Sequence, residues 1–252
     1  MTKHIAVAMI GAAGLLSGCN FSQPMPGCIV QDGDWQAKYT LKTSEHAGQA
    51  CGALKGEALG VYKFTDPKKA GSTILAIRPE GAAALMVHHY ETTTVDSSGK
   101  EVTEKVAAPR VTDARVATTI GSFADEPDAN SFCGGTSFTP AAVNASVVYD
   151  KYQTTKEVAP AQSLTYSFDK VEVYSDPAAP GTQLRAELSY TEGGCTAKYD
   201  VVAMWPIVEC TPGSTDPKTS CGEGSGVNPD FAVECDQALK VCVPSKPIPS
   251  LK

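Results

Sequence analysis

Residues 184–203 read LRAELSYTEGGCTAKYDVVA, and this stretch decides the fold class that we expect. Apolar side chains occupy every second position in residues 184–190 and again in residues 195–203. A period of two turns one set of side chains toward a core and the other toward water. The intervening residues 191–194 (TEGG) have the composition of a loop. We therefore expect two antiparallel strands with one buried face and one solvated face.

Further segments with strand character precede this hairpin. They comprise residues 35–41, 60–64, 73–78, 84–95, 100–106 and 164–173, with weaker candidates at 118–123 and 146–149. The alternation slips at Asp169 and Lys170, which indicates a β-bulge. Residues 96–99 (DSSG) have the composition of a hairpin turn. Many short strands separated by turns favour an antiparallel β-sandwich, or alternatively a small β-barrel.

Helical patterns are sparse in this chain. Residues 46–59 (HAGQACGALKGEAL) could hold a short helix. Gly48, Gly52 and Gly56 weaken that helix, because each glycine costs about 1 kcal/mol relative to alanine. We therefore expect a mainly β domain over residues 28–209.

The last part of the chain, residues 210–252, changes character. It holds four cysteines with the spacing C-x10-C-x13-C-x6-C, many turn residues and few apolar side chains. Because this region has too little apolar surface to form a core of its own, we expect disulfide bonds to stabilise it. Residues 231–243 contain enough alternating apolar side chains for one small hairpin. We expect a small disulfide-stapled C-terminal module.

The chain has nine cysteines, of which one lies near the N-terminus. The other eight form an even set, which in an exported protein reads as four disulfides in an oxidising compartment. These candidates are Cys28, Cys51, Cys133, Cys195, Cys210, Cys221, Cys235 and Cys242. Sequence alone does not fix the connectivity. We expect Cys28 to pair with Cys51 and Cys133 with Cys195, while the four tail cysteines pair among themselves.

The N-terminus carries an export signal. A basic start at Lys3 precedes an apolar run over residues 5–16, and Leu16-Ser17-Gly18-Cys19 follows directly. The run is shorter than the roughly 20 apolar residues that cross a bilayer, so it is typical of a secretory signal. The four residues at its end resemble the lipobox of bacterial lipoproteins.

The lipobox resemblance implies how the protein is processed and held. Cleavage would fall between Gly18 and Cys19, and Cys19 would carry a diacylglyceryl group on sulfur and an acyl chain such as palmitate on nitrogen. Each buried methylene contributes about 0.8 kcal/mol, so two or three chains anchor firmly. Asn20, where some lipoproteins have Asp, implies sorting to the outer membrane. With its cysteine-rich tail, the chain resembles myxobacterial-type outer-membrane lipoproteins.

Four regions follow from these observations: a signal peptide at 1–18, a lipidated tether at 19–27, a β domain at 28–209 and a cysteine-rich tail at 210–252. The tether of nine residues reaches at most about 30 Å. The chain has 21 Lys and Arg against 28 Asp and Glu, a net charge of −7. Such a surface repels nucleic acid, so we expect a membrane partner through the acyl chains and no nucleic-acid partner.

Two features raise the possibility of a binding site. Gly33-Asp34-Trp35 resembles the opening of lipocalin and avidin barrels, where the tryptophan closes one end of a ligand cavity. The alternative is a turn followed by a buried aromatic side chain. His88 and His89 are adjacent, and neighbours on a strand point to opposite faces. With His46 as the only other histidine after Cys19, we identify no zinc site and expect no metal.

No catalytic constellation stands out in the sequence. The acidic segment 125–130 lacks the residue order of an EF-hand and is interpreted as a solvated loop. The glycine-rich segment 134–137 follows no strand-to-helix pattern. A hydrolase would need a histidine beside a serine or carboxylate. We expect a non-enzymatic interaction or structural module with an unidentified envelope or extracellular protein partner and no cofactor besides the lipid on Cys19. The alternatives are a small-ligand-binding β-barrel lipoprotein and, after it, a secreted hydrolase that would use His46, His88 or His89.

Overall fold

The computed structural model describes residues 27–69 and 71–252. The predicted signal peptide, the cleavage position after Gly18 and the lipidated Cys19 lie outside the described residues. Among the residues that are described, helices are all too short to traverse a bilayer. The description therefore covers the predicted β domain and the cysteine-rich tail.

Strands make up most of the regular secondary structure in the described residues, beside one short α-helix and three 3-10 helices. The strands are β1 (Gly33–Leu41), β2 (Gly56–Thr65), β3 (Thr73–Pro79), β4 (Val87–Val95), β5 (Glu101–Pro109), β6 (Thr119–Phe123), β7 (Phe132–Thr136), β8 (Ala141–Ala145), β9 (Val148–Tyr149), β10 (Glu157–Ala159), β11 (Gln162–Asp176), β12 (Ala179–Glu192), β13 (Cys195–Met204), β14 (Val233–Cys235) and β15 (Cys242–Pro244). The helices are η1 (Ser44–His46), η2 (Ala50–Gly52), α1 (Glu80–Ala84) and η3 (Ala114–Ala117).

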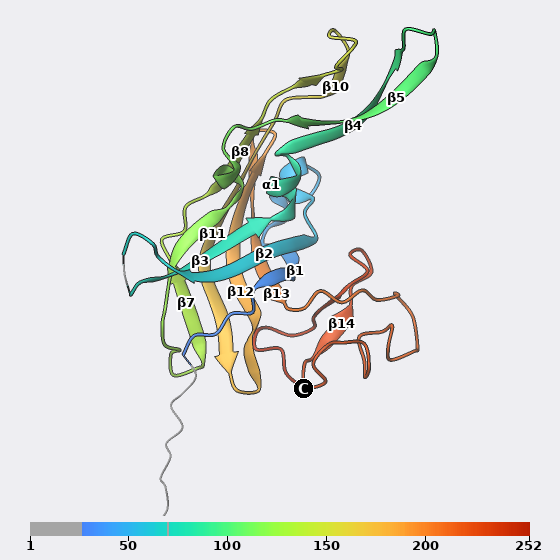
Figure 1. Cartoon of the computed structure of the whole chain (residues 1–252). Coiled ribbons are helices and arrows are strands. Elements are labelled where there is room, and N and C mark those ends of the chain that lie inside the picture. The colour runs from blue at the N-terminus through green and yellow to red at the C-terminus, as the bar shows by residue number, and fades with distance from the viewer. Residues whose placement is uncertain (1–26, 70) are drawn as a thin grey trace, which may run out of the picture.

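Nine strands form one antiparallel sheet in the order β12-β13-β1-β2-β3-β6-β7-β11-β8, and β11 also pairs with β12. Eight of them thus close into a ring, while β8 pairs with the first part of β11 and β7 with a later part. The ring is not a regular barrel, because β6 and β7 meet in two residue pairs. The expected mainly β, antiparallel fold is confirmed (Figure 1).

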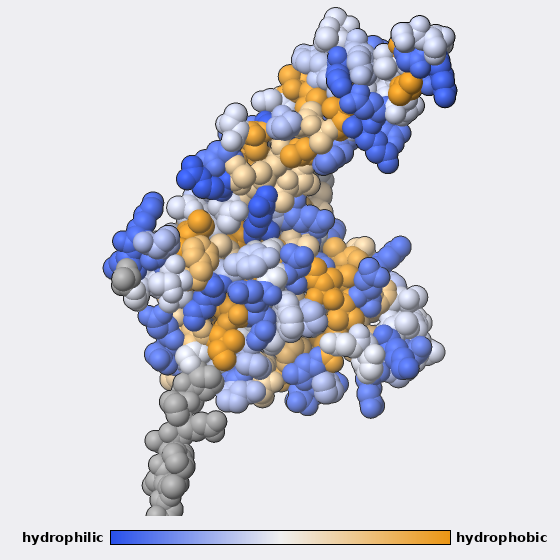
Figure 2. Space-filling model, in the orientation of Figure 1, coloured by the Kyte–Doolittle hydropathy of each residue, from blue (hydrophilic) through white to orange (hydrophobic). Residues whose placement is uncertain are grey.

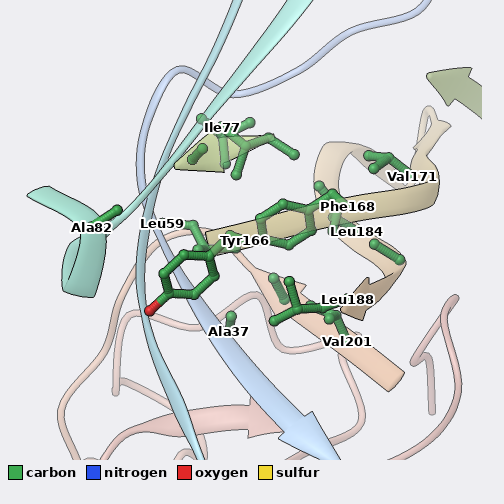
Figure 3. Packing of buried hydrophobic residues seen from close by; sticks show 14 of the residues in the cluster. Ala37, Leu59, Ile77, Ala82, Tyr166, Phe168, Val171, Leu184, Leu188 and Val201 are labelled. Carbon is green, nitrogen blue, oxygen red and sulfur yellow. The ribbon is translucent and has the colours of Figure 1, made fainter. Parts of the chain in front are cut away.

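The interior of the ring is filled by side chains. Figure 3 shows Tyr166 and Phe168 of β11 among Ile77, Leu188 and Val201, which come from strands on different sides of the ring. All five side chains are at most 5% exposed. Burying a large apolar side chain contributes about 1.5–3 kcal/mol relative to leaving it exposed. The ring is therefore held by a packed core of the kind found in small closed sheets.

The hairpin in residues 184–203 forms as predicted. β12 and β13 pair antiparallel without a register shift from Gln183 opposite Met204 to Glu192 opposite Cys195. The alternating apolar side chains of both strands are buried. The predicted bulge is also present, because the pairing of β11 with β12 shifts between Asp169 and Glu172. A strand period is a local property, which is why the sequence predicts it well.

The short helix considered for residues 46–59 is wrong. The segment contains the 3-10 turn η2 and then enters β2 at Gly56. The turn depends on Gly52, because a Cβ there would lie 1.8 Å from the carbonyl oxygen of His46. Gly56 has a φ of 156°, in the region that favours glycine. These glycines therefore build a tight turn and a strand start.

Two of the expected disulfides are wrong. Cys28 pairs with Cys133 and Cys51 with Cys195, at Cα–Cα distances of 5.6 and 5.8 Å. The bonded residues are 105 and 144 positions apart in the sequence. Closure of the ring brings the segment before β1 to β7, and η2 to the start of β13. Each cysteine therefore bonds to one that the closed ring brings near, whereas the prediction pairs cysteines that follow one another in the sequence.

The tail cysteines pair among themselves, as predicted. Cys210 bonds Cys235, and Cys221 bonds Cys242. The expected small hairpin is formed by β14 and β15. The C-terminal region is therefore disulfide-linked, and its short strands are held by covalent bonds rather than by a large core.

The tail also packs on the ring. Phe231 is 1% exposed and belongs to a second buried cluster with Met204 and Tyr174. The backbone N–H of Ser250 donates to the side-chain oxygen of Gln183 at 2.7 Å, and both residues are buried. The tail is thus fastened to β12 and β13 by apolar and polar contacts.

Candidate functional site

A long two-stranded ribbon leaves the body of the protein (Figure 1). It consists of β4 and β5, which pair from Val87 opposite Pro109 to Val95 opposite Glu101. At about 3.4 Å per residue, such a ribbon extends about 30 Å. Its turn is the predicted one, because Asp96 accepts hydrogen bonds from the backbone N–H groups beyond it. The ribbon is the most prominent projection of the molecule.

A second, smaller hairpin packs against this ribbon. It consists of β9, β10 and the loop between them, which begins at Asp150. The hydroxyl group of Thr92 in β4 donates to the Asp150 carboxylate, and both residues are buried. The backbone N–H groups of Tyr152 and Gln153 also donate to Asp150, at 2.9 and 3.0 Å. These backbone bonds, first that of Tyr152, lower the pKa of Asp150.

More polar contacts join the two hairpins. Lys151 donates to the Glu104 carboxylate at 2.8 Å, and the Tyr152 hydroxyl group donates to it at 2.7 Å. The backbone N–H of Lys151 donates to the Tyr90 hydroxyl group at 3.0 Å. The hydrogen bonds from Lys151 and Tyr152 lower the pKa of Glu104. We call residues 87–109 and 148–159 together the arm.

The arm offers an accessible recognition surface. In the described part of the chain β4 pairs with β5, and β9 with β10, without further strand partners. Their outer edges therefore present backbone N–H and C=O groups that another strand can pair with. Large side chains are also accessible, with Val95 at 61%, Tyr149 at 48% and Tyr152 at 45% exposure. Free edges beside exposed aromatic side chains suit the binding of an extended segment.

The histidines do not form a common site. His88 stacks on Tyr90 with 5.9 Å between ring centroids, and His89 is exposed on the other face of β4. His46 belongs to η1, which lies beside η2 on the ring rather than in the arm. The candidate histidines of a hydrolase therefore sit on separate elements.

Trp35 is a buried aromatic side chain and does not close a ligand cavity. It is completely inaccessible, and its indole N–H donates to the carbonyl oxygen of Gln31 at 2.8 Å. An inaccessible side chain cannot line an open ligand cavity. A surface groove of about 510 Å³ lies elsewhere, between the outside of β1, β11, β12 and β13 and the C-terminal segment. Its charged walls are paired, for example Lys38 with Glu234 at 2.8 Å.

The acidic segment 125–130 and the glycine-rich segment 134–137 stabilise local structure. Asp128 accepts hydrogen bonds from the backbone N–H groups of Asn130 and Phe132, each at 2.8 Å. These bonds, first that of Phe132, lower the pKa of Asp128. Gly135 belongs to β7, where a Cβ would lie 2.7 Å from the ring of Phe138. The acidic segment thus stabilises its own loop through hydrogen bonds, and the glycine-rich segment leaves space for the ring of Phe138.

Sequence reasoning missed a half-buried carboxyl group at one end of the ring. Glu57 accepts hydrogen bonds from the Tyr39 hydroxyl group at 2.9 Å and from the backbone N–H of Gly81 at 2.5 Å. Burial raises the pKa of Glu57, and burial also raises the pKa values of Tyr39 and Tyr166 above their usual range. The group was overlooked because a carboxylate between Gly56 and Ala58 resembles a solvated position. Glu57 joins α1 to the ring.

The arm itself was only half predicted. Its hairpin turn was found, but not its departure from the body. The signal was present in residues 100–106, where charged side chains occupy both faces of the expected strand. A strand with polar residues on both faces cannot cover a core, so it must project into solvent.

The sequence is similar to a family of known proteins. A family model described as MlpA matches residues 33–206, which run from the start of β1 to just beyond β13. The chain belongs to the MlpA family. An MlpA relative from Myxococcus xanthus, named "Putative lipoprotein MlpA", is 37% identical over 265 residues and covers 100% of both chains. No solved structure matches this MlpA-family chain significantly.

Membership in the MlpA family confirms the recognition of a bacterial lipoprotein of myxobacterial type. The match to the relative extends over the whole chain, so it includes the lipobox region as well as the cysteine-rich tail. The MlpA comparisons name a lipoprotein without a specific activity.

Proposed function

We propose that this MlpA-family protein is a lipid-anchored outer-membrane module that binds an envelope or extracellular protein through its arm, without catalysis. The observation that carries this proposal is the arm, a pair of hairpins with free strand edges that project from a disulfide-bonded ring. A rigid body with one projecting element suits presentation of a binding surface.

The anchor is supported by the sequence and by the family. Cys19 ends a lipobox, and a full-length relative is named as a lipoprotein. Asn20 favours the outer membrane over retention in the inner one. Cys19 is also not needed by any of the four disulfides, which use the other eight cysteines. The arm lies at the opposite end of the molecule from the blue segment that leads into β1 (Figure 1).

The arm supports recognition by strand addition. A partner segment that pairs with the edge of β4 or β5 gains main-chain hydrogen bonds, and the exposed side chains of the arm supply selectivity. The polar contacts between the hairpins hold these edges in a fixed geometry before binding. Such preorganisation lowers the entropy lost on association.

The anchor is tested in cells by fractionation and mass spectrometry. We expect the mature protein in the outer-membrane fraction, with acyl chains on Cys19, and we expect Cys19→Ala to lose membrane attachment. An unmodified thiol at Cys19 would contradict the anchor. Native protein found in the inner-membrane fraction would contradict the outer-membrane part of the proposal.

The arm is tested by photocrosslinking in intact cells. A benzoyl-phenylalanine probe replaces Tyr149 or Tyr152 in the arm, and as a control Lys218, an exposed residue of the cysteine-rich tail. We expect discrete protein adducts from the two arm positions and none from the control. Adducts at the control position alone, or at none of the positions, would reject the arm as the binding element.

A further inference from the structure

An apolar patch covers the outside of three neighbouring strands of the ring. Tyr62 in β2 lies opposite Ala76 in β3, which lies opposite Ile120 in β6. In the next row Phe64 lies opposite Ile74. These five residues, which we call the apolar patch, point away from the core because the residues between them point inward. Tyr62, Phe64 and Ile120 are 49%, 40% and 37% exposed.

The apolar patch lies beside the point where the chain enters the ring. The side chain of Lys63, between Tyr62 and Phe64, donates to the carbonyl oxygen of Cys28. The backbone N–H of Cys28 donates to the carbonyl oxygen of Asp125 at 2.8 Å, just beyond the end of β6. The described chain therefore begins beside the last residues of β2 and β6, next to the row of the apolar patch that holds Phe64 and Ile74.

The segment before this point is short. From Cys19 to Gly27 the chain has nine residues, which span at most about 30 Å when fully extended. Acyl chains on Cys19 would lie in the membrane, so the apolar patch stays within reach of the lipid surface. A tether of this length also gives a high effective concentration, so a weak contact suffices.

We propose that the apolar patch rests on the lipid surface of the membrane that holds Cys19. This inference depends on the proposed lipid anchor. We assign the membrane surface as the binding partner of the apolar patch because the short tether keeps the patch close to it at all times. The membrane surface also offers both an apolar and a polar layer. A docked patch fixes which side of the ring faces the membrane.

The composition of the region suits a headgroup interface. Tyrosine combines an apolar body with a polar tip that suits the interfacial zone, and phenylalanine is typical of the apolar face of segments that lie in this zone. Lys68 and Lys69 are exposed in the loop between β2 and β3, where they can approach anionic headgroups although the chain as a whole is acidic. Figure 2 shows apolar side chains gathered beside this loop, with hydrophilic side chains on the loop itself.

The test supplies the anchor chemically, so it does not depend on lipidation in cells. A chain that begins at Cys19 is coupled through that thiol to a maleimide lipid in phosphatidylethanolamine and phosphatidylglycerol vesicles. Hydroxyl-radical oxidation is then compared with that of the uncoupled chain in solution. Tyr62 and Phe64 are the reporters, and Tyr149 and Tyr152 of the arm are the matched internal controls, with exposures of 48% and 45%.

We expect oxidation of the two reporters to fall severalfold on coupling, while oxidation of the arm tyrosines stays unchanged. The double variant Phe64→Ser and Ile120→Ser should restore oxidation of Tyr62, because both changes are at exposed positions and weaken only the lipid contact. The matched variant Tyr149→Ser and Tyr152→Ser should leave the protection of Tyr62 intact.

Three results would overturn the proposal: equal oxidation of the reporters with and without coupling, protection of the arm in place of the patch, or protection that appears only when envelope proteins are added. Mass spectrometry of native protein separates this inference from the anchor. An unmodified Cys19 thiol in cells would reject the anchor, whereas reporters that stay oxidised on the coupled chain reject the lipid-facing patch.

Discussion

The hydroxyl oxygen of Thr92 lies 2.9 and 2.8 Å from the two carboxylate oxygens of Asp150, and its hydrogen bond joins two hairpins through residues that are 58 positions apart in the sequence. Both side chains are buried at this junction. The same carboxylate accepts backbone hydrogen bonds from its own loop. Asp150 therefore organises the smaller hairpin and attaches it to the longer one, which makes the arm one unit.

Replacing Asp150 by Asn should loosen the arm without unfolding the ring. Asparagine keeps the size of the side chain but removes the charge and one of the two acceptor oxygens. We expect faster amide hydrogen exchange in residues 148–159 and in the facing part of β4, and an almost unchanged melting temperature. Glu157→Gln is the control, because this exposed carboxylate in β10 should be replaceable without effect. Equal amide hydrogen exchange in Asp150→Asn and Glu157→Gln would show that the contact between Thr92 and Asp150 does not hold the two hairpins together.

Replacing Glu57 by Ala should destabilise the ring itself. The change leaves the hydroxyl group of Tyr39 and the backbone N–H of Gly81 without their acceptor in a buried place. An unsatisfied buried polar group costs about 1–3 kcal/mol. We expect a lower free energy of unfolding, measured in urea, by about that amount for each group. An unchanged urea midpoint would mean that water replaces the carboxylate.

The half-buried carboxyl group of Glu57 also predicts a pH dependence. Burial raises the pKa of Glu57, so the folded protein holds this proton more tightly than the unfolded chain. The cost of ionising it is fully present above the folded pKa and is relieved as pH falls toward the unfolded value of about 4.3.

Wild type should therefore gain stability over Glu57→Gln as pH is lowered within that window, because glutamine does not titrate. The measurement is the difference between the two urea midpoints along a pH series. Glu157→Gln, at an exposed carboxylate in the arm and away from Glu57, is the control and should follow wild type at every pH. A constant difference between wild type and Glu57→Gln would contradict the half-buried, proton-binding role.

Local and long-range features of this fold were not equally predictable. Alternation in β12 and β13 and the slip at Asp169 depend on neighbouring residues, so the sequence indicated both correctly. The ring closes through pairs such as β7 with β11, which no local pattern specifies. The wrong pairing of Cys28 and Cys51 has the same origin, because each bonds to a partner that only the closed ring brings near.

The candidate site divides in the same way. The hairpin turn at Asp96 could be predicted from composition, and so could the burial of Trp35. The contact between Thr92 and Asp150 could not, because neither residue type is diagnostic and they lie on separate hairpins. Glu57 was hidden for another reason, since a carboxylate between glycine and alanine resembles a solvated position until the strand is placed beside α1.

The long-range disulfide at the start of the ring gives the last prediction. Cys28 bonds Cys133 across 105 residues, and it fixes the start of the described chain onto β7. Such a crosslink restricts the unfolded chain, and removing it costs about 2–5 kcal/mol in small secreted domains. The double variant Cys28→Ala and Cys133→Ala should lose about this much free energy of unfolding. Peptide mapping of the native protein should find Cys28 joined to Cys133 and Cys51 to Cys195, and a peptide joining Cys28 to Cys51 would contradict the structure.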